Sequence, residues 1–281
     1  PGSVRHSENH RMIHPTAQVH PSAQVAADVE IGAFAIVEAD TVLGPGCRLA
    51  AHAVVRSGSA LGSAVLVDSF AVVGGLPQMR SPVANPGRVV VGDRCVLREG
   101  VTVHRPTKAE GVTRLGNDCY LMANSHVAHD SQVGDFVTLA NNAMLAGHVT
   151  VGAHSFVGGG AGIHQFVRVG PIAMIAGNAA ISYDVPPFAI AADRNDVCGL
   201  NLVGLRRQGM DAATVADLKR CFRAAYFQGG DPRRLAAAAL AAGTCGLTEA
   251  GRQFLGFFAE GKRGFARARR SKDGAESQAA D

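Results

Sequence analysis

A six-residue period of aliphatic side chains runs through the first two thirds of the chain. Counting in sixes from Ile13 to Ile181, Ile, Leu or Val occupies 26 of 29 positions. The fourth residue after each of these is almost always small, as at Ala17, Ala23 and Cys47. An α-helix repeats every 3.6 residues and a plain strand every two, so neither explains this period. The pattern instead predicts a short strand and a corner, repeated three times per turn of a triangular coil.

Glycine residues reinforce the triangular repeat. Six of them share one phase of an 18-residue period, which is three units of six: Gly44, Gly62, Gly116, Gly134, Gly152 and Gly170. A glycine that recurs once per coil predicts a corner whose backbone torsion angles other residues avoid. Two segments, 74–88 and 104–114, interrupt the phase and are rich in proline, glycine or charge. We expect them to be loops bulging from a rigid repeat, where function tends to lie.

The repeat resembles that of the hexapeptide-repeat transferases, whose fold is a left-handed parallel β-helix and whose members are usually trimers. We therefore expect a mainly β fold, with this helix over residues 12–188. Residues 1–11 are interpreted as a tag and a disordered lead-in.

The C-terminal part has a different pattern. The hexads stop after Pro187, and residues 189–209 are predicted to be a connector. Residues 210–270 then predict a small α-helical domain, because helix-start signals recur at Asp211, Asp231-Pro232 and Thr248. Residues 271–281 are polar and are expected to be disordered.

Cysteine usage and charge narrow the class of protein. The six cysteines form no C-x-x-C pair, and three of them occupy small inward positions as core fillers: Cys47, Cys95 and Cys119. We find no signal peptide and no long apolar run, so we expect a cytoplasmic protein without a membrane span. Residues 205–281 carry 14 basic and 8 acidic side chains, which suits either an acidic partner or a solvated helical face.

Four histidines converge on one edge of the predicted coil. They occupy neighbouring phases of the 18-residue frame in three successive coils: His126, His129, His148 and His164. In the same frame Gly147 and Gln165 stack on His129. Because coils stack about 4.8 Å apart, these side chains should lie within roughly 10 Å of one another. The sequence therefore predicts a functional site here, whereas histidines such as His52 and His154 are interpreted as structural.

The residue types at this edge favour general-base chemistry. Asp130 follows His129, and a carboxylate beside an imidazole fixes its tautomer and raises its basicity. No cysteine or serine occupies an evident nucleophile elbow. A zinc site is the alternative, since the γ-class carbonic anhydrases use three histidines on a β-helix. Their histidine spacing does not match this chain, so we expect no metal.

Five motifs are specific in combination: residues 124–130 (NSHVAHD), 145–148 (LAGH), 163–166 (IHQF), 184–188 (DVPPF) and 199–207 (GLNLVGLRR). Together they resemble the UDP-N-acetylglucosamine O-acyltransferases, the family that begins lipid A synthesis. The resemblance covers about residues 12–265 and implies that His129 is the general base, Asp130 orients it and the Gly147 amide is an oxyanion donor. It implies seven substrate-binding residues: His126, His148, His164, Gln165, Asn201, Arg207 and Arg80. It also places Gly177 at the family's acyl-chain ruler.

The resemblance further implies substrates and assembly. The donor would be a 3-hydroxyacyl thioester of acyl carrier protein, and the acceptor would be the 3-hydroxyl of UDP-N-acetylglucosamine, a UDP-amino sugar. No cofactor and no nucleic acid partner are expected. The protein would be a homotrimer with its sites at subunit interfaces, and the basic C-terminal helices would receive the acidic carrier protein.

Departures from the family pattern leave alternatives open. Where the family usually has Gln-Asp-x-Lys, this chain has Gln78-Met79-Arg80-Ser81, and Gln208 replaces a basic residue. A different nucleotide sugar, or an amino acceptor that would give an amide, is therefore the second hypothesis. A coenzyme-A-dependent acetyltransferase and a catalytically silent β-helix are further alternatives. The basic helical extension argues against the acetyltransferase, and the converging histidines argue against the silent scaffold.

Overall fold

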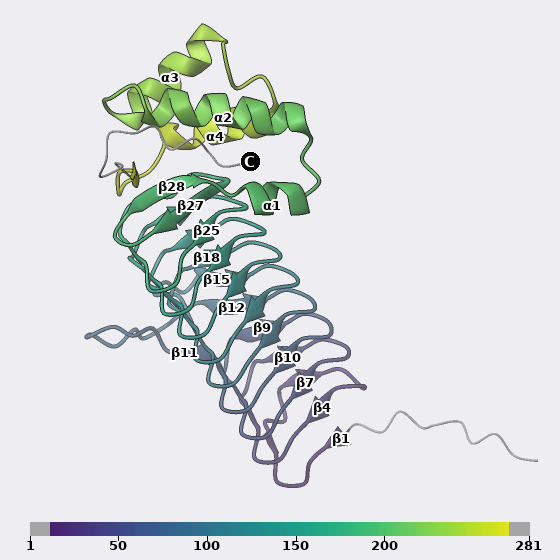
Figure 1. Ribbon diagram of the computed structural model, residues 1–281. Coiled ribbons are helices and arrows are strands. Elements are labelled where there is room, and N and C mark those ends of the chain that lie inside the picture. The colour runs from purple at the N-terminus through teal and green to yellow at the C-terminus, as the bar shows by residue number, and fades with distance from the viewer. Residues whose placement is uncertain (1–11, 270–281) are drawn as a thin grey trace, which may run out of the picture.

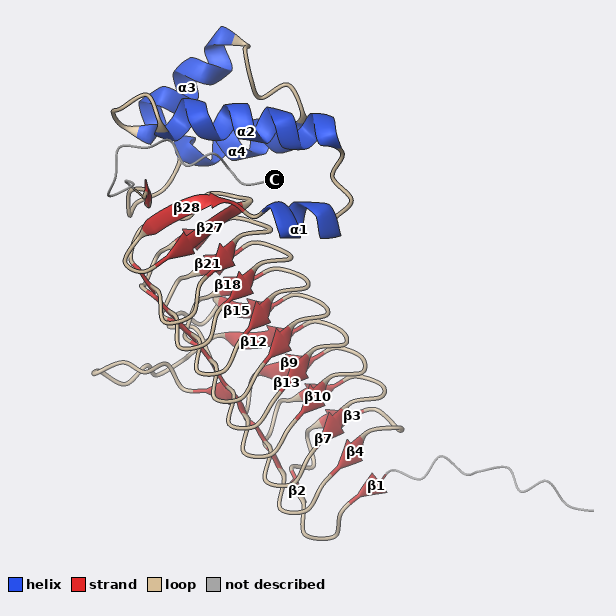
Figure 2. Cartoon of the chain, in the orientation of Figure 1, coloured by secondary structure: helices blue, strands red, loops and turns tan. Residues whose placement is uncertain are grey.

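The computed structural model describes residues 12–269, which form a triangular β-helical prism with helices at its C-terminal end (Figures 1 and 2). Strands β1 to β26 wind around the prism, and neighbouring strands of a sheet are three places apart in the chain. All their pairings are parallel, as in β1 with β4. The predicted lead-in, residues 1–11, and the predicted tail, residues 271–281, lie outside the described part of the chain.

Three parallel sheets form the sides of the prism. The first sheet contains β1 (Met12–Ile13), β4 (Glu30–Ile31), β7 (Arg48–Leu49), β10 (Leu66–Val67), β13 (Val96–Leu97), β16 (Tyr120–Leu121), β19 (Thr138–Leu139), β22 (Phe156–Val157) and β25 (Met174–Ile175). The second contains β2 (Gln18–Val19), β5 (Ile36–Val37), β8 (Val54–Val55), β11 (Val72–Gly75), β14 (Thr102–His104), β17 (His126–Val127), β20 (Met144–Leu145), β23 (Gly162–Ile163) and β26 (Ala180–Ile181). The third contains β3 (Gln24–Val25), β6 (Val42–Leu43), β9 (Ser59–Leu61), β12 (Arg88–Val91), β15 (Val112–Leu115), β18 (Gln132–Val133), β21 (Thr150–Val151) and β24 (Arg168–Val169).

The core of the prism consists of the predicted large and small inward positions. The aliphatic residue of each hexad is buried along the interior, as at Ile31, Leu97 and Leu139. The three cysteines at small positions are also buried and free of disulfides, as the sequence predicted: Cys47, Cys95 and Cys119. Short aliphatic side chains suffice because the three sheets lie close together, which explains why the chain needs so few aromatic residues.

The glycines of the 18-residue period do not have the predicted role. Gly44 and Gly134 adopt ordinary backbone angles, but a Cβ on Gly134 would lie 2.7 Å from a backbone nitrogen of the next coil. The left-handed conformation belongs instead to the residue two positions later, such as Asp118 and Phe136, with φ of 55° and 56°. These glycines are therefore required for the close stacking of coils rather than for unusual torsion angles.

The two predicted loops are insertions into the coil. One joins β11 to β12 and projects sideways from the prism (Figure 1), and the other joins β14 to β15. The strand register continues across both, since Val73 pairs with Val103 and Val103 with Val127. The prism is therefore uninterrupted, and the insertions are free to carry side chains to its surface.

The segment 189–209, predicted to be a connector, is regularly folded. It contains β27 (Ala189–Ala192), β28 (Asp196–Leu200) and α1 (Leu202–Arg207). Strand β27 extends the first sheet beyond β25 and pairs antiparallel with β28, which also pairs with β29 (Arg267–Ala268). The prediction missed these strands because the hexad signal ends where the backbone hydrogen bonding of the first sheet continues.

The C-terminal helices begin at the predicted residues. They are α2 (Ala212–Tyr226), α3 (Pro232–Ala242) and α4 (Glu249–Gly256), followed by the short 3₁₀ helix η1 (Phe257–Ala259). Asp211, Asp231 and Thr248 cap them by accepting hydrogen bonds from backbone N–H groups in the first turn. No helix in the described part of the chain is long and apolar enough to cross a membrane.

Arg168 links the prism to the helical domain. Arg168, on β24, contacts the fully buried Asp184 at 2.8 Å and donates hydrogen bonds to the carbonyl oxygens of Phe257 and Glu260. Its guanidinium also lies over the Phe257 ring. Loss of Arg168 would leave the buried Asp184 charge unpaired, which is costly, and would remove these two hydrogen bonds to the helical domain.

Candidate active site

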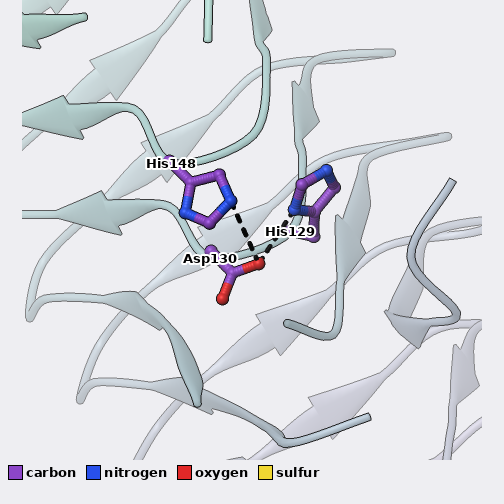
Figure 3. Close-up of side chains that lie close together, drawn as sticks. All are labelled: His129, Asp130 and His148. Carbon is purple, nitrogen blue, oxygen red and sulfur yellow. Dashed lines mark hydrogen bonds and ion pairs between the residues drawn. The ribbon is translucent and has the colours of Figure 1, made fainter. Parts of the chain in front are cut away.

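His129 and Asp130 form a hydrogen-bonded pair at the corner that follows β17 (Figure 3). We call this edge, residues 129–130, 147–148 and 165–166, the histidine corner. The His129 Nδ1–H donates to Asp130 Oδ2 at 2.9 Å, and the two side chains are only 12% and 14% exposed. Because the carboxylate holds the proton on Nδ1, the lone pair of His129 Nε2 is left to act as a base.

A loop residue fixes the Asp130 carboxylate. Both the N–H and the hydroxyl of Thr107 donate to Asp130 Oδ2, each at 3.0 Å, and the Asp130 N–H donates to Thr113 Oγ1 at 2.8 Å. Burial opposes ionisation of this carboxyl, but the hydrogen bonds from His129 and Thr107 outweigh it and hold its pKa below the usual range. Asp130 is therefore an anion at neutral pH.

His148 completes the cluster from the next coil. Its Nε2 lies 3.7 Å from Asp130 Oδ2, and its ring meets the His129 ring edge-on, with centroids 5.3 Å apart. Phe166, one coil further, stacks on the His148 ring with centroids 4.6 Å apart. Burial lowers the pKa of His148, although the Asp130 charge partly opposes the shift. The ring is 35% exposed and can therefore meet a substrate.

Gly147 lies directly against the His129 ring, as the 18-residue frame predicted. A Cβ at this position would collide with His129 Cε1. The Gly147 carbonyl accepts from Phe166 N–H, but its own N–H donates to no group in the described residues. The corner thus places a free N–H donor beside the basic face of an imidazole, the combination that an acyl-transfer oxyanion hole requires.

His126 and His104 form a second imidazole pair beside the first. Their centroids are 5.1 Å apart, and His126 Nδ1 shares a 2.7 Å hydrogen bond with Thr102 Oγ1. Burial, with a smaller contribution from the neighbouring imidazoles, lowers the pKa of His126 to about 4. His104 and Thr107 were not predicted from the sequence. Both lie at the start of the predicted loop 104–114, which was a signal that functional side chains could be found there.

The remaining predicted residues are more scattered. His164, Gln165, Arg80 and Arg207 have exposed side chains, and His164 Nδ1 lies 3.3 Å from the Gln165 carbonyl oxygen. Asn201 caps α1 by accepting from Gly204 N–H and donates to the Ile172 carbonyl, so its amide already has two structural partners. Gly177 stacks on Gly159 at the corner between the first and second sheets. Within a single chain it is therefore far from the histidine corner, which lies between the second and third sheets.

The donor atoms of His129, Asp130 and His148 all lie within 4.8 Å of one another, close enough for one metal ion. Two imidazoles and a carboxylate are common ligands of zinc. However, Asp130 Oδ2 already accepts hydrogen bonds from His129 and from both donors of Thr107. A proton relay accounts for every one of these contacts, and the absence of a metal remains a prediction.

Known proteins resemble this chain over most of its length. A family model described as Udp N-acetylglucosamine O-acyltransferase, Domain 2, matches residues 184–266, and the bacterial transferase hexapeptide (six repeats) model matches residues 113–147. Two relatives are acyl-[acyl-carrier-protein]–UDP-N-acetylglucosamine O-acyltransferases. The one from Campylobacter concisus is 41% identical over 77% of this chain and 84% of its own length, and that from Agrobacterium fabrum is 40% identical over 80% and 84%.

Solved structures agree with the sequence matches. The UDP-N-acetylglucosamine acyltransferase from Campylobacter jejuni superposes with a TM-score of 0.84 at 37% identity, covering 92% of this chain and 100% of that one. The Francisella novicida enzyme gives 0.86 at 30% identity, covering 91% and 94%. These matches confirm the predicted left-handed parallel β-helix with a small C-terminal helical region. The chain therefore belongs to the UDP-N-acetylglucosamine O-acyltransferase family.

Proposed function

We propose that the protein transfers a 3-hydroxyacyl group from acyl carrier protein to the 3-hydroxyl of UDP-N-acetylglucosamine, the first step of lipid A synthesis. The observation that carries the proposal is the His129–Asp130 pair, with the free Gly147 N–H against the same imidazole. The names of the C. concisus and A. fabrum relatives support an O-acyl transfer from acyl carrier protein to UDP-N-acetylglucosamine.

The histidine corner accounts for each bond that changes. His129 Nε2 takes the proton of the sugar hydroxyl, and the alkoxide attacks the thioester carbonyl carbon. The Gly147 N–H donates to the oxyanion, a contact worth about 3 kcal/mol in comparable sites. The C–S bond then breaks, and the leaving thiolate receives the proton from the His129 imidazolium, which Asp130 stabilises in the interval. The products are an ester and a thiol, so no cofactor is needed.

The other histidines and the polar residues of the C-terminal region would bind the acceptor. His126 and His148 flank the pair and are kept neutral by burial, so they suit hydrogen bonds to the sugar and its phosphates. The more exposed residues, of which Arg207 and Arg80 carry positive charge, would hold the nucleotide: His164, Gln165, Asn201, Arg207 and Arg80.

A homotrimer with its sites between subunits fits the separation of two predicted residues. Gly177, the proposed acyl-chain ruler, lies on a different corner from His129, so an acyl chain could reach both only across a subunit boundary. Exposed apolar side chains on the first and second sheets support such packing: Met144, Phe156 and Met174. We place the enzyme in the cytoplasm, with acyl carrier protein received by the basic C-terminal helices.

A related reaction on another nucleotide sugar, or on an amino acceptor, is the second candidate. The first loop favours it, because Met79, which is 49% exposed, and Ser81 cannot make the ionic contacts of the usual Asp and Lys.

One assay separates the two candidates. Purified protein is mixed with 3-hydroxyacyl carrier proteins of several chain lengths and UDP-N-acetylglucosamine, and the products are analysed by mass spectrometry before and after mild alkaline hydrolysis. A base-labile acylated UDP-N-acetylglucosamine supports the main proposal. A product formed only with another UDP-sugar, or a base-stable amide, supports the second candidate.

A further inference from the structure

His104, like His129, lies against a glycine, but its Nδ1 has a different partner. The ring of His129 lies against Gly147 with its Nδ1 held by the carboxylate of Asp130. The ring of His104 lies against Gly75, whose added Cβ would be 3.2 Å from Nε2, and its Nδ1–H donates to the Leu76 carbonyl oxygen at 2.7 Å. One imidazole is thus oriented by a negative charge and the other by a neutral oxygen.

The neutral partner changes what the ring can do. A carbonyl oxygen only accepts hydrogen bonds, so the proton of His104 is on Nδ1 and its Nε2 carries a lone pair. Burial lowers the pKa of His104, with smaller contributions from His129 and Arg56, so the ring is uncharged at neutral pH. Without a carboxylate to stabilise an imidazolium, His104 is poorly suited to take a proton, but it remains a good hydrogen-bond acceptor.

His104 Nε2 has no partner in the described residues, yet solvent reaches it. This atom forms no hydrogen bond there. It is not one of the unpartnered side-chain atoms that are cut off from solvent, which in the described part are Ser59 Oγ and Ser125 Oγ. The centroids of the His104 and His126 rings are 5.1 Å apart. The loop that begins after His104 brings Thr107 to Asp130. An accessible lone pair therefore lies next to the proposed reaction site.

We infer that His104 is a positioning residue for the acceptor, which accepts a hydrogen bond from a sugar hydroxyl or the N-acetyl N–H through Nε2 while its Nδ1 ties down the first loop at Leu76. Gly75 keeps Nε2 open, because any side chain there would cover it. This inference rests on the proposed function, since it names a contact to the acceptor sugar.

Two substitutions at His104 separate the acceptor from the loop anchor. In His104→Asn the side-chain amide can still donate to the Leu76 carbonyl but does not reach the position of Nε2. In His104→Gln the amide oxygen reaches that position but the anchor is lost. Loss of one hydrogen bond should raise the KM for UDP-N-acetylglucosamine about fivefold in His104→Asn. His104→Gln should stay nearer to wild type, and the KM for acyl carrier protein should be unchanged in both.

Gly75→Ala tests the open face while leaving His104 in place, and His154→Ala is the imidazole control on another corner. We expect Gly75→Ala to raise the sugar KM, and the Kd measured by calorimetry, about as much as His104→Asn, with the melting temperature preserved. A wild-type KM for UDP-N-acetylglucosamine in both Gly75→Ala and His104→Asn would overturn the acceptor role. So would a KM near wild type in His104→Asn together with a raised KM in His104→Gln. A wild-type protein that neither binds nor acylates UDP-N-acetylglucosamine would instead overturn the proposed function itself.

Discussion

Two corners of the prism have the same backbone conformation but different chemistry. At the histidine corner, His148 adopts φ of 61° and stacks on Phe166 at 4.6 Å. At the corner formed by residues 135–136, 153–154 and 171–172, which we call the phenylalanine corner, His154 adopts φ of 59° and stacks on Phe136 at 4.7 Å. The His154 side chain makes no hydrogen bond within the described residues, whereas His148 lies beside the Asp130 carboxylate.

The difference arises from an insertion. The loop between β14 and β15 begins beside His104 and brings Thr107 to Asp130, while neither insertion within residues 12–269 contributes a hydrogen bond to the phenylalanine corner. A repeat scaffold therefore supplies many equivalent corners, and a loop makes one of them reactive by fixing a carboxylate next to an imidazole. Changes at one corner should abolish transfer, and matched changes at the other should be silent.

The largest expected effect is that of His129→Ala. Loss of the general base should lower kcat by about 100- to 10,000-fold. The matched variant, His154→Ala, removes an exposed imidazole from the phenylalanine corner and should retain wild-type kcat. The rates are compared by the acyl-transfer assay at saturating substrates, and a fully active His129→Ala would place the chemistry elsewhere.

Gly147→Ala should have the next largest effect. The new Cβ would collide with the His129 ring and displace it from its hydrogen bond to Asp130. A misplacement of about 1 Å at a reacting group can cost roughly 100-fold in rate. We expect kcat to fall by that order while circular dichroism retains the β-helical spectrum. An alanine variant with normal kcat would show that the ring does not have to stay where the structure has it.

Thr107→Val should have a moderate effect, because it removes one of the two donors that Thr107 supplies to Asp130 and keeps the backbone N–H. The lost hydrogen bond is worth about 1 kcal/mol, which corresponds to roughly fivefold in kcat/KM. Thr107→Ser retains the hydroxyl and should restore most of the rate. Equal rates for the valine and serine variants would remove the loop from the account.

The smallest expected effect is that of a chelator. The hydrogen bonds of Asp130 account for the cluster without a metal, so prolonged dialysis against EDTA should leave kcat unchanged. A loss of activity that zinc restores would mean that His129, Asp130 and His148 hold an ion.

The sequence predicted the prism well because stacking imposes a strict period. The aliphatic residues of the hexads from Ile31 to Ile181 are buried in a repeated environment, and the frame also placed Gly147 against His129. The continuation of the first sheet through β27 and β28 could not be predicted, because those strands pair by backbone hydrogen bonds without the hexad pattern.

Side-chain partners were harder to predict than the fold. The adjacency of His129 and Asp130 indicated their pairing, but Thr107 reaches Asp130 through an insertion that has no period. His104 was missed for the same reason, since its role depends on the carbonyl of Leu76 in the other loop. The recurrence of the corner glycines was explained wrongly by unusual torsion angles. A close approach between coils also requires a glycine once per coil, so the sequence does not distinguish the two causes.

The most direct test of the account is the acyl-transfer rate of Asp130→Asn measured beside that of Asp118→Asn. The two aspartates adopt the same left-handed conformation, with φ of 62° and 55°, but Asp118 pairs with Arg94, in earlier coils of the edge that carries the phenylalanine corner. An asparagine at position 130 can donate to His129 Nδ1 and move the imidazole proton to Nε2, where it blocks the base. We predict a loss of about 100-fold or more for Asp130→Asn and none for Asp118→Asn. Equal rates in the two variants would contradict it.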